Sequence, residues 1–187
     1  MKRKLLAAAL AVLCLSVAVY GTVAYFTAED TATNVITAGN VKIALNEAAI
    51  TEEGETVAFE DVTGVVPGAE ISKIVTVDNT GDNAAYVRIK VVKEITSENE
   101  PEGEFDPSLI GLDLDVENWT EKDGYYYYNT PLEAGETTAP LFTTVTFSKD
   151  MGNLYADALT TIQVHAEAVQ VENNGSDVMS ADGWPAD

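Results

Sequence analysis

The sequence predicts an all-β protein, folded as an antiparallel, jelly-roll-like β-sandwich with one or two short helices. Three observations lead to this fold class. Short segments alternate apolar and polar residues, turn-forming residues separate these segments, and helical periodicity is confined to brief stretches. Seven or eight strands can be recognised in this way. With 187 residues, 46% of them hydrophobic, the chain can bury one core of ordinary size.

The first 24 residues have the three parts of a secretory signal peptide. Residues 2–4 (Lys-Arg-Lys) form a basic start, residues 5–20 form an apolar run, and residues 22–24 (Thr-Val-Ala) offer small side chains before a cleavage site. We therefore expect an N-terminal signal helix that is cleaved between Ala24 and Tyr25. An uncut membrane anchor is the alternative, because the apolar run with its flanks is just long enough to cross a bilayer.

The single cysteine of the chain, Cys14, lies within this signal segment. The exported part then contains none, which excludes disulfides and cysteine-based metal or redox chemistry there. Leu13 stands where a lipoprotein signal needs a small residue, and this argues against lipid attachment at Cys14. The absence of cysteine favours the surface of a Gram-positive bacterium, where the oxidising machinery is weak.

Residues 25–38 form an extended segment that contains neither Gly nor Pro. A strand that enters a neighbouring subunit gains main-chain hydrogen bonds and apolar pockets for alternate side chains. We expect the segment to act as such a strand and to link copies of the protein into a polymer. The residues of this polymerisation strand are Tyr25, Phe26, Ala28, Ala32, Val35, Ile36 and Ala38. Two alternatives stay open: the segment forms the first strand of its own domain, or it remains without regular structure.

Alternation predicts the first strands of the body at residues 41–45, 71–79 and 84–93. Between the first two lies a predicted loop, residues 46–56, which is rich in Glu and Ala. Dense turn chemistry in residues 78–83 suggests that the second and third strands pair with each other in antiparallel fashion. In the third, Val, Ile and Val face one way while Tyr, Arg and Lys face the other, as in a half-buried strand.

The second half of the body continues the pattern. Residues 97–108 form an acidic loop, and residues 109–116 are ambiguous between a short helix and a strand. Further strands are predicted at residues 125–128, 141–147 and 162–171, with a short helix at 150–159. The four consecutive tyrosines place two rings on each face of their strand. The predicted organisation is a signal peptide (1–24), an extended segment (25–38), a β-sandwich domain (39–172) and a C-terminal tail (173–187).

The charge of the chain is strongly acidic, with 31 acidic and 10 basic residues and a net charge of −21. Three of the basic residues lie in the signal segment, so the exported part carries 7 basic against 31 acidic residues. Such a surface repels nucleic acid and anionic lipid, so neither is expected as a partner. A solvated acidic surface on a secreted protein is the ordinary interpretation.

The residues assemble no recognisable catalytic or metal motif. His165 is the only histidine; it lies on a strand opposite the apolar face, and nothing near it in sequence suggests a triad. The two-histidine zinc motif His-Glu-x-x-His is absent, so a zinc site built from His165 and carboxylates has no support from spacing. The sequence therefore assigns no catalytic residue, no metal ligand and no cofactor.

Two weaker site hypotheses come from carboxylates and aromatic residues. One carboxylate group comprises Asp113, Asp115 and Glu117, and the other comprises Asp78 and Asp82. Hard cations such as calcium bind oxygen sets of this kind, but no loop has the spacing of an EF-hand. The four tyrosines with Trp119 suggest either a carbohydrate-stacking platform or, more commonly for strands, cross-strand packing.

Several stretches of the sequence resemble the TasA/camelysin (CalY) family of Firmicutes. The resemblance rests on GTVAYFTAEDTATN at the signal junction, followed by ITAGNVKIAL and PGAEISKIVTVDNTGDNAAYVRI. The later stretches DGYYYYNTPLEAGETTAPLFTTVTF and IQVHAEAVQV are similar to the C-terminal half of camelysin-like members. The match extends over nearly the whole chain in order and pattern, and its most specific part is the signal junction.

The resemblance implies a jelly-roll-like protein of the extracellular matrix or cell surface, exported through the signal peptidase SipW. Members form biofilm fibres, in which the freed N-terminal segment enters the next subunit, or are named as spore-coat-associated proteins. The partners implied are further copies of the chain, SipW, and other matrix proteins. The family also implies a cell-surface metal-dependent endopeptidase as an alternative function, although the standard zinc motif is missing. A membrane-tethered adhesion module is a third, minor alternative.

Overall fold

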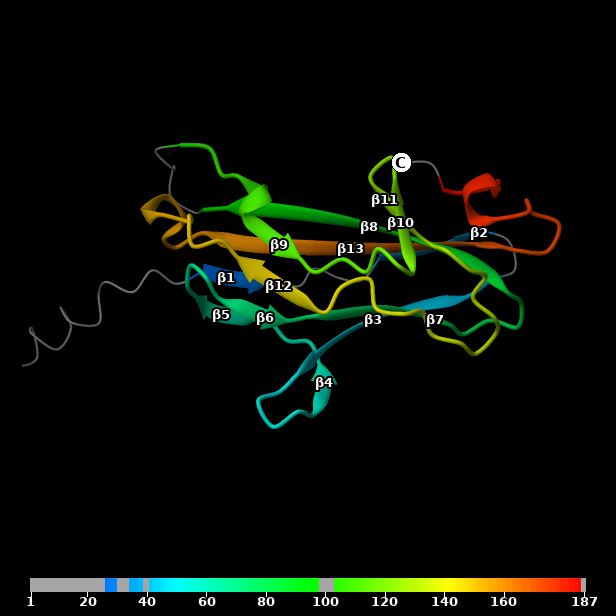
Figure 1. Cartoon of the computed structure of the whole chain (residues 1–187), viewed down its shortest axis with the longest axis horizontal. Helices are drawn as coiled ribbons and strands as arrows, with labels where there is room; N and C mark the ends of the chain where they lie inside the picture. Colours follow the sequence, from blue (N-terminus) through cyan, green and yellow to red (C-terminus); the bar gives the residue numbers. More distant parts are fainter. Residues whose placement is uncertain (1–25, 30–33, 39–40, 98–102, 186–187) are drawn as a thin grey trace, which may run out of the picture.

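The computed structural model describes residues 26–29, 34–38, 41–97 and 103–185, which fold into two facing β-layers (Figure 1). This confirms the predicted all-β sandwich. The predicted signal peptide, its cleavage site at Ala24 and Tyr25, and Ala32 of the polymerisation strand lie outside the described residues. Across the described ranges, no helix has the length and apolar character needed to span a membrane.

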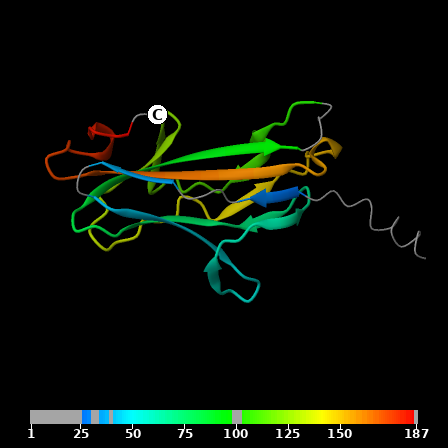
Figure 2. The same cartoon turned by 180° about the vertical axis from the view of Figure 1, so that it is seen from behind.

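The larger layer is a seven-stranded sheet in the order β10-β11-β8-β13-β1-β5, with β2 also paired to β13. Its strands are β1 (Phe26–Glu29), β2 (Asn34–Ala38), β5 (Val62–Val65), β8 (Ala85–Thr96), β10 (Trp119–Lys122), β11 (Tyr125–Tyr128) and β13 (Leu159–Gln170). The two long strands, β8 and β13, form its centre and run side by side in Figures 1 and 2. The predicted strands at 84–93 and 162–171 correspond to these two.

The second layer consists of two three-stranded sheets, β4-β3-β7 and β6-β12-β9. Their strands are β3 (Ile43–Ile50), β4 (Thr56–Ala58), β6 (Glu70–Ser72), β7 (Ile74–Asn79), β9 (Ile110–Leu112) and β12 (Thr144–Phe147). Main-chain bonds join the two sheets, because Leu141 N donates to Val75 O at 2.9 Å and Lys73 N donates to Thr143 O at 2.9 Å. The segment before β12 therefore runs along β7, and the two sheets act as one layer.

The core lies between the layers and is built by the alternation read from the sequence. Val75 and Val77 from β7 face Val87 and Ile89 from β8, and all four are fully buried. Phe142, Phe147, Val164 and other inward residues complete this cluster. Burial of such side chains stabilises the fold by about 1.5–3 kcal/mol each. The sandwich is thus held mainly by apolar contact between its two inner faces.

The predicted pairing of residues 71–79 with 84–93 is wrong. β7 pairs with β3, whereas β8 pairs with β11 and β13 in the other layer. The connection crosses between layers and is organised by the buried Asn79, whose amide Nδ2 donates to Asn83 O at 2.8 Å and to Leu132 O at 2.9 Å. Turn-forming residues indicate a change of direction, but they do not determine which layer the next strand joins.

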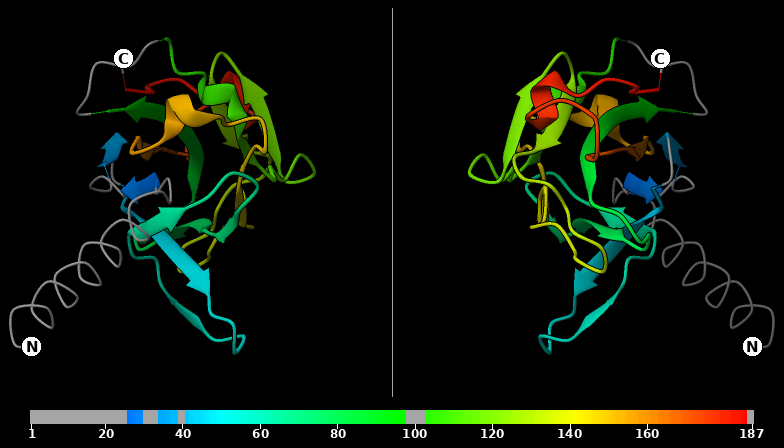
Figure 3. Two further views of the ribbon diagram at one scale, coloured as in Figure 1. Left: turned by 90° about the vertical axis from the view of Figure 1, so that its left-hand side faces the viewer. Right: turned by 90° about the vertical axis from the view of Figure 1, so that its right-hand side faces the viewer.

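The predicted loop at residues 46–56 is also wrong, because β3 continues to Ile50 and β4 pairs back onto it. The hairpin turns at residues 51–54 and projects from the body of the domain (Figure 3). Most of its acidic residues lie in or beside the turn, and its strands carry small or β-branched residues, which is compatible with an exposed two-stranded ribbon. The hairpin forms through backbone pairing between β3 and β4, and β4 buries no side chain.

Helical structure is limited to three short 3₁₀ turns in the described part of the chain. These are η1 (Pro107–Leu109), η2 (Asn153–Tyr155) and η3 (Val178–Ser180). The helix predicted at residues 150–159 is therefore only the single turn η2. The ambiguous stretch 109–116 contains the strand β9 over Ile110–Leu112, while Leu109 closes the turn η1.

The outer face of the larger sheet is partly covered by the C-terminal tail. Residues Tyr86, Tyr125, Tyr127, Val169 and Val178 form a second buried cluster there, against which Trp184 packs. The strand at β8 was predicted to be half-buried, but Tyr86 and Arg88 on its outer face are 3% and 8% exposed. The tail, which lacks periodicity, supplies this cover by packing across the sheet.

Candidate functional site

The candidate site is the edge of β13 that faces away from β8. On its β8 side, β13 is paired along its whole length, from Leu159↔Thr96 to Gln170↔Ala85. On the opposite side it receives the two N-terminal strands, both in parallel orientation. β13 therefore pairs with both β1 and β2 on the side that faces away from β8.

The described parts of the predicted polymerisation strand pair with this edge in consecutive registers. β1, which holds Phe26 and Ala28, runs along the first part of β13 with Thr27 opposite Leu159. β2, which holds Val35, Ile36 and Ala38, follows with Asn34 opposite His165 and Ala38 opposite Val169. Within a single copy, the segment therefore occupies a place in its own sheet. Its pairing with another copy stays a prediction.

β1 fills a slot between two strands. It pairs with β13 on one side and with β5 on the other, where Ala28 lies opposite Val62 and Phe26 opposite Val65. In the described part of the chain, β5 joins the seven-stranded sheet only through β1. A strand is required at this position if β5 and β13 are to belong to one sheet.

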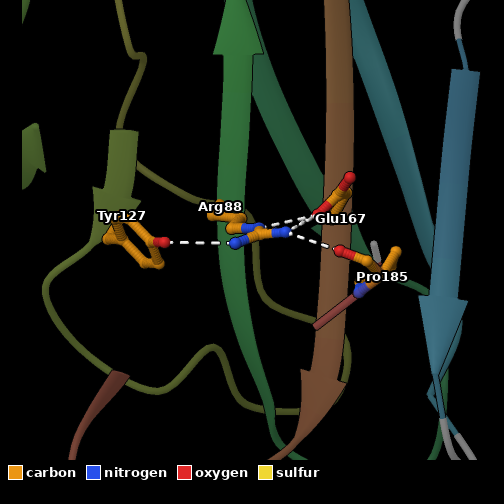
Figure 4. Close-up of polar contacts among 4 residues, drawn as sticks. All are labelled: Arg88, Tyr127, Glu167 and Pro185. Atoms are coloured by element: carbon orange, nitrogen blue, oxygen red, sulfur yellow. Dashed lines mark hydrogen bonds and ion pairs between the residues drawn. The ribbon is translucent and has the colours of Figure 1, made fainter. Parts of the chain in front are cut away.

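One side of the slot is β13, which is held to β8 by contacts that involve neither β1 nor β2. Arg88 on β8 and Glu167 on β13 are directly opposite each other, and both are buried. Arg88 Nε donates to Glu167 Oε2 at 2.6 Å, and Nη2 approaches the same oxygen at 2.6 Å (Figure 4). Charge-assisted bonds of this kind fix the geometry as well as adding energy. β13 is thus anchored to β8 at Glu167, a residue that also lies opposite Ile36 of β2.

The remaining N–H groups of Arg88 donate to β11 and to the C-terminal tail, which cover the outer face of the larger sheet. Nη1 donates to Tyr127 Oη at 3.1 Å, and Nη2 donates to Pro185 O at 3.1 Å (Figure 4). The guanidinium also lies 3.8 Å from the ring centre of Tyr125 and 4.7 Å from that of Trp184. Burial alone would lower the pKa of Arg88, but the hydrogen bonds to Tyr127 and Glu167 outweigh burial and raise it. Arg88 therefore stays charged and links three segments of the chain.

Sequence reasoning missed this network. Its members come from β8, β11, β13 and the tail, and no spacing along the chain connects them. One signal was available: Arg88 alternates with apolar residues on a predicted strand, and strand arginines on an otherwise apolar sheet need a partner. The sequence did not identify Glu167 as that partner, because register between distant strands is set by the fold.

His165, the residue considered for catalysis, and the carboxylates of the described chain do not form a cluster. His165 is half-buried on β13, and its register partners are Lys90 and Asn34. Among the residues that the structure describes, no three His, Cys, Asp or Glu side chains lie close enough to hold a metal ion. His165 is therefore not part of such a group among the described residues.

The predicted carboxylate groups instead organise loops. Asp113 accepts from the backbone N–H groups of Thr143 at 2.8 Å and Thr144 at 2.6 Å. Its partial burial raises the pKa, but the bonds from Thr143 and Thr144 outweigh this and hold the pKa below its usual value. Asp115 accepts from Asn118 Nδ2 at 2.7 Å, and Asp78 accepts from Thr137 Oγ1 at 2.6 Å. Each of these three carboxylates thus has a structural role.

The aromatic residues are packed rather than presented to solvent. Trp119 is 2% exposed, its Nε1 donates to Ala139 O at 3.2 Å, and its ring lies 5.0 Å from that of Tyr128. The tyrosines of β11 divide between the faces as predicted, with Tyr125 and Tyr127 buried on the outer side and Tyr126 and Tyr128 against the main core. The geometry supports the packing interpretation over a carbohydrate platform.

The fold and the candidate site define a class of protein, an all-β sandwich in which the first strands of the described chain, β1 and β2, extend the larger sheet beside β13. The chain belongs to the camelysin metallo-endopeptidase family, whose family model matches residues 1–178. This match confirms the family resemblance read from the sequence. No curated protein matches the chain.

Proposed function

We propose that this protein is a secreted structural component of the extracellular matrix that assembles into fibres by exchange of its N-terminal strands. One observation carries the proposal: β1 is an inserted strand at the beginning of the described chain and the link between β13 and β5. A strand from a second copy can satisfy the same backbone groups in the same register. The site is thus an acceptor for the segment that each copy also carries.

Connectivity makes the segment exchangeable. Residues 25–38 join the rest of the domain only at residues 39–40, so both strands can leave together without breaking the β8–β13 pair. The strands left behind would expose unpaired backbone groups on β13, and such an edge recruits another strand. In an exchange, the contacts that β1 and β2 make with their own copy would therefore be replaced by the same contacts with another copy.

The geometry of this exchange leads to filaments rather than rings when the rotation between copies does not close. Each copy gives a strand at one site and receives one at another, which is a head-to-tail contact. Pairing within one copy competes, because the segment is tethered next to its own slot at an effective concentration in the millimolar range. Assembly is therefore expected to rise steeply with protein concentration.

Export would control the availability of the segment. Cleavage after Ala24 by the signal peptidase SipW removes the apolar run and frees Tyr25 as the new N-terminus. Before cleavage the tail is held at the membrane, and afterwards it can pair with another copy. The location that follows is the cell surface or matrix, with further copies and other matrix proteins as partners.

The test is deletion of residues 25–34 from the processed chain, residues 25–187. We expect a folded monomer, since β8 and β13 pair with each other along their whole length without this segment, and we expect no fibres by negative-stain electron microscopy. Adding a synthetic peptide of residues 25–38 should fill the slot without restoring fibres, because a free peptide cannot link two copies. Fibres of normal appearance from the deletion variant would contradict the proposal.

A second candidate function is metal-dependent endopeptidase activity, which the name of the matching family favours. Casein hydrolysis by the purified chain would support it if the activity is lost with a chelator and in His165→Ala. Fibre growth from processed protein in the absence of such hydrolysis would support the structural role.

A further inference from the structure

The β3–β4 hairpin and β5 enclose an open groove with a volume of about 580 Å³. The hairpin contributes Ala49, Val57 and Ala58 to its wall, and residues 60–63 contribute the rest. The hairpin projects from the body of the domain, so this surface is accessible from outside (Figure 3). Strand exchange uses the backbone of β5, which also lines this groove, but it does not use the hairpin.

The hairpin side of the groove is apolar, whereas the exposed carboxylates of Glu60 and Asp61 lie on the other side. Val57 is 43% exposed and lies directly opposite Ala49 in the hairpin, so both side chains are on the same face. Exposed β-branched residues on a projecting ribbon contribute nothing to the main core. A partner that covers Val57 would gain the hydrophobic free energy that the fold leaves unused.

β4 also has an open edge. In the described part of the chain it pairs with β3 alone. Phe59 N donates to Glu47 O and Thr51 N donates to Glu55 O, so the alternation of an antiparallel ladder directs the N–H groups of Thr56 and Ala58 away from β3. The sequence of β4, Thr-Val-Ala, lacks the charges and prolines that commonly protect an edge. A further strand can therefore be added here.

The charge around the groove indicates the chemistry of the partner. Residues 43–72 contain seven acidic residues and no Lys or Arg. Glu60 and Asp61 line the groove, and Glu52 and Glu53 lie in the adjacent turn. Glu47 forms an ion pair with the buried Lys73, whose Nζ lies 3.0 Å from its Oε1. A second copy carries the same excess of acid and is repelled, whereas a basic partner is attracted.

We propose that the groove beside β4 is a docking site for an extended, basic polypeptide segment. The segment adds as a strand to the open edge of β4, places apolar side chains against Val57 and Ala49, and pairs its Lys or Arg residues with the surrounding carboxylates. The open edge of β4 is not part of the slot used for fibre formation, and β1 keeps its pairing with β5, so the chain can bind such a partner while it is part of a fibre.

The experiment measures the binding of labelled ten-residue peptides to the processed chain by fluorescence anisotropy. A peptide that alternates Lys and Val should bind, and binding should weaken as salt is raised from about 50 to about 300 mM. Peptides that alternate Glu with Val, or Lys with Ser, should bind at least about tenfold more weakly. Equal binding of the Lys-Ser peptide would overturn the proposal, since it would show only bulk attraction to an acidic surface.

Matched variants locate the site. Val57→Thr and the triple variant Glu52→Gln, Glu53→Gln, Glu60→Gln should each weaken the Lys-Val peptide at least about fivefold. Controls of the same chemistry on other exposed surfaces should change it less than about twofold; these are Val116→Thr and the triple variant Glu94→Gln, Glu117→Gln, Glu121→Gln.

Strand addition has its own variant. Ala58→Pro removes an N–H that points away from β3 and should reduce binding without unfolding the domain, as monitored by circular dichroism. Equal losses in the groove and control variants, or full binding by Ala58→Pro, would contradict the proposal. A change in sedimentation of the groove variants without a change in peptide binding would identify a second copy as the occupant and overturn it as well.

Discussion

Arg88 shows how much of this fold depends on one buried charge. It faces outward from the sheet, yet it is covered by aromatic rings and by the tail, and it is neutralised by Glu167 at 2.6 Å. A buried ion pair gives little net stability compared with apolar residues, but removing one partner leaves an uncompensated charge. The pair therefore acts chiefly by fixing the register of β8 and β13 and by holding the tail.

We predict that Glu167→Gln lowers the free energy of unfolding by about 2–3 kcal/mol, because the charge of Arg88 then remains buried without its counterion. Urea denaturation monitored by tryptophan fluorescence measures this change. The matched control is Glu94→Gln, an exposed position on β8, which should shift stability by less than about 0.5 kcal/mol. Combining Glu167→Gln with Arg88→Met should recover part of the loss. A loss in the double variant that equals or exceeds the single one would contradict this account.

At the scale of elements, the sequence predicted strands better than it predicted their partners. β8 and β13 were expected because Val87, Ile89, Val164 and Ala166 alternate with polar residues, and this alternation reflects burial on one face. The pairing of β7 was missed because the turn chemistry at residues 78–83 is equally compatible with a hairpin and with a crossing between layers. Long-range contacts decide between the two, and they leave no local signal.

The same limit applied to the candidate site. The segment 25–38 stood out from its position and composition, but its slot between β13 and β5 depends on contacts across more than half of the chain. The hairpin groove was also missed, although the lack of any basic residue over residues 43–72 was a usable signal. Charge patterning along the chain was informative here where motifs were absent.

Asp113 joins two elements, since it follows β9 and accepts the N–H groups at the start of β12. Its pKa is held below its usual value of 3.8, so the unfolded chain binds a proton at higher pH than the folded one. The stabilisation from this carboxylate is therefore present above its ordinary pKa and is lost as pH falls through the lowered, folded value.

We accordingly expect Asp113→Asn to destabilise the domain at about pH 7 and to have a smaller effect as the pH is lowered below about 4. Chemical denaturation of both proteins across this range gives the measurement. Asp150→Asn, on an exposed turn, serves as the control and should change stability at about pH 7 by less than about 0.5 kcal/mol. A stability difference for Asp113→Asn that is constant with pH would show that the carboxylate charge is not what holds β12.

The larger sheet combines a long central pair of strands, β8 and β13, with the shorter strands β1 and β2 on the far side of β13. β8 and β13 hold each other along twelve register pairs, while β1 pairs with β13 over three residues. Under the proposed strand exchange, this asymmetry would let β1 leave while the central pair stays folded. The acidic surface would keep copies apart elsewhere, so the proposal confines association to the slot between β13 and β5.

The most direct test of this account uses two single-cysteine variants of the processed chain, Thr27→Cys and Leu159→Cys, which occupy opposite positions in the β1–β13 register. The processed chain contains no other cysteine, so a disulfide in a mixture of the two can form only between copies. Exchange predicts a crosslinked dimer under mild oxidation that increases with protein concentration, whereas Val116→Cys mixed with Leu159→Cys should give none above background. Absence of the specific dimer under conditions where unmodified protein forms fibres would contradict strand exchange.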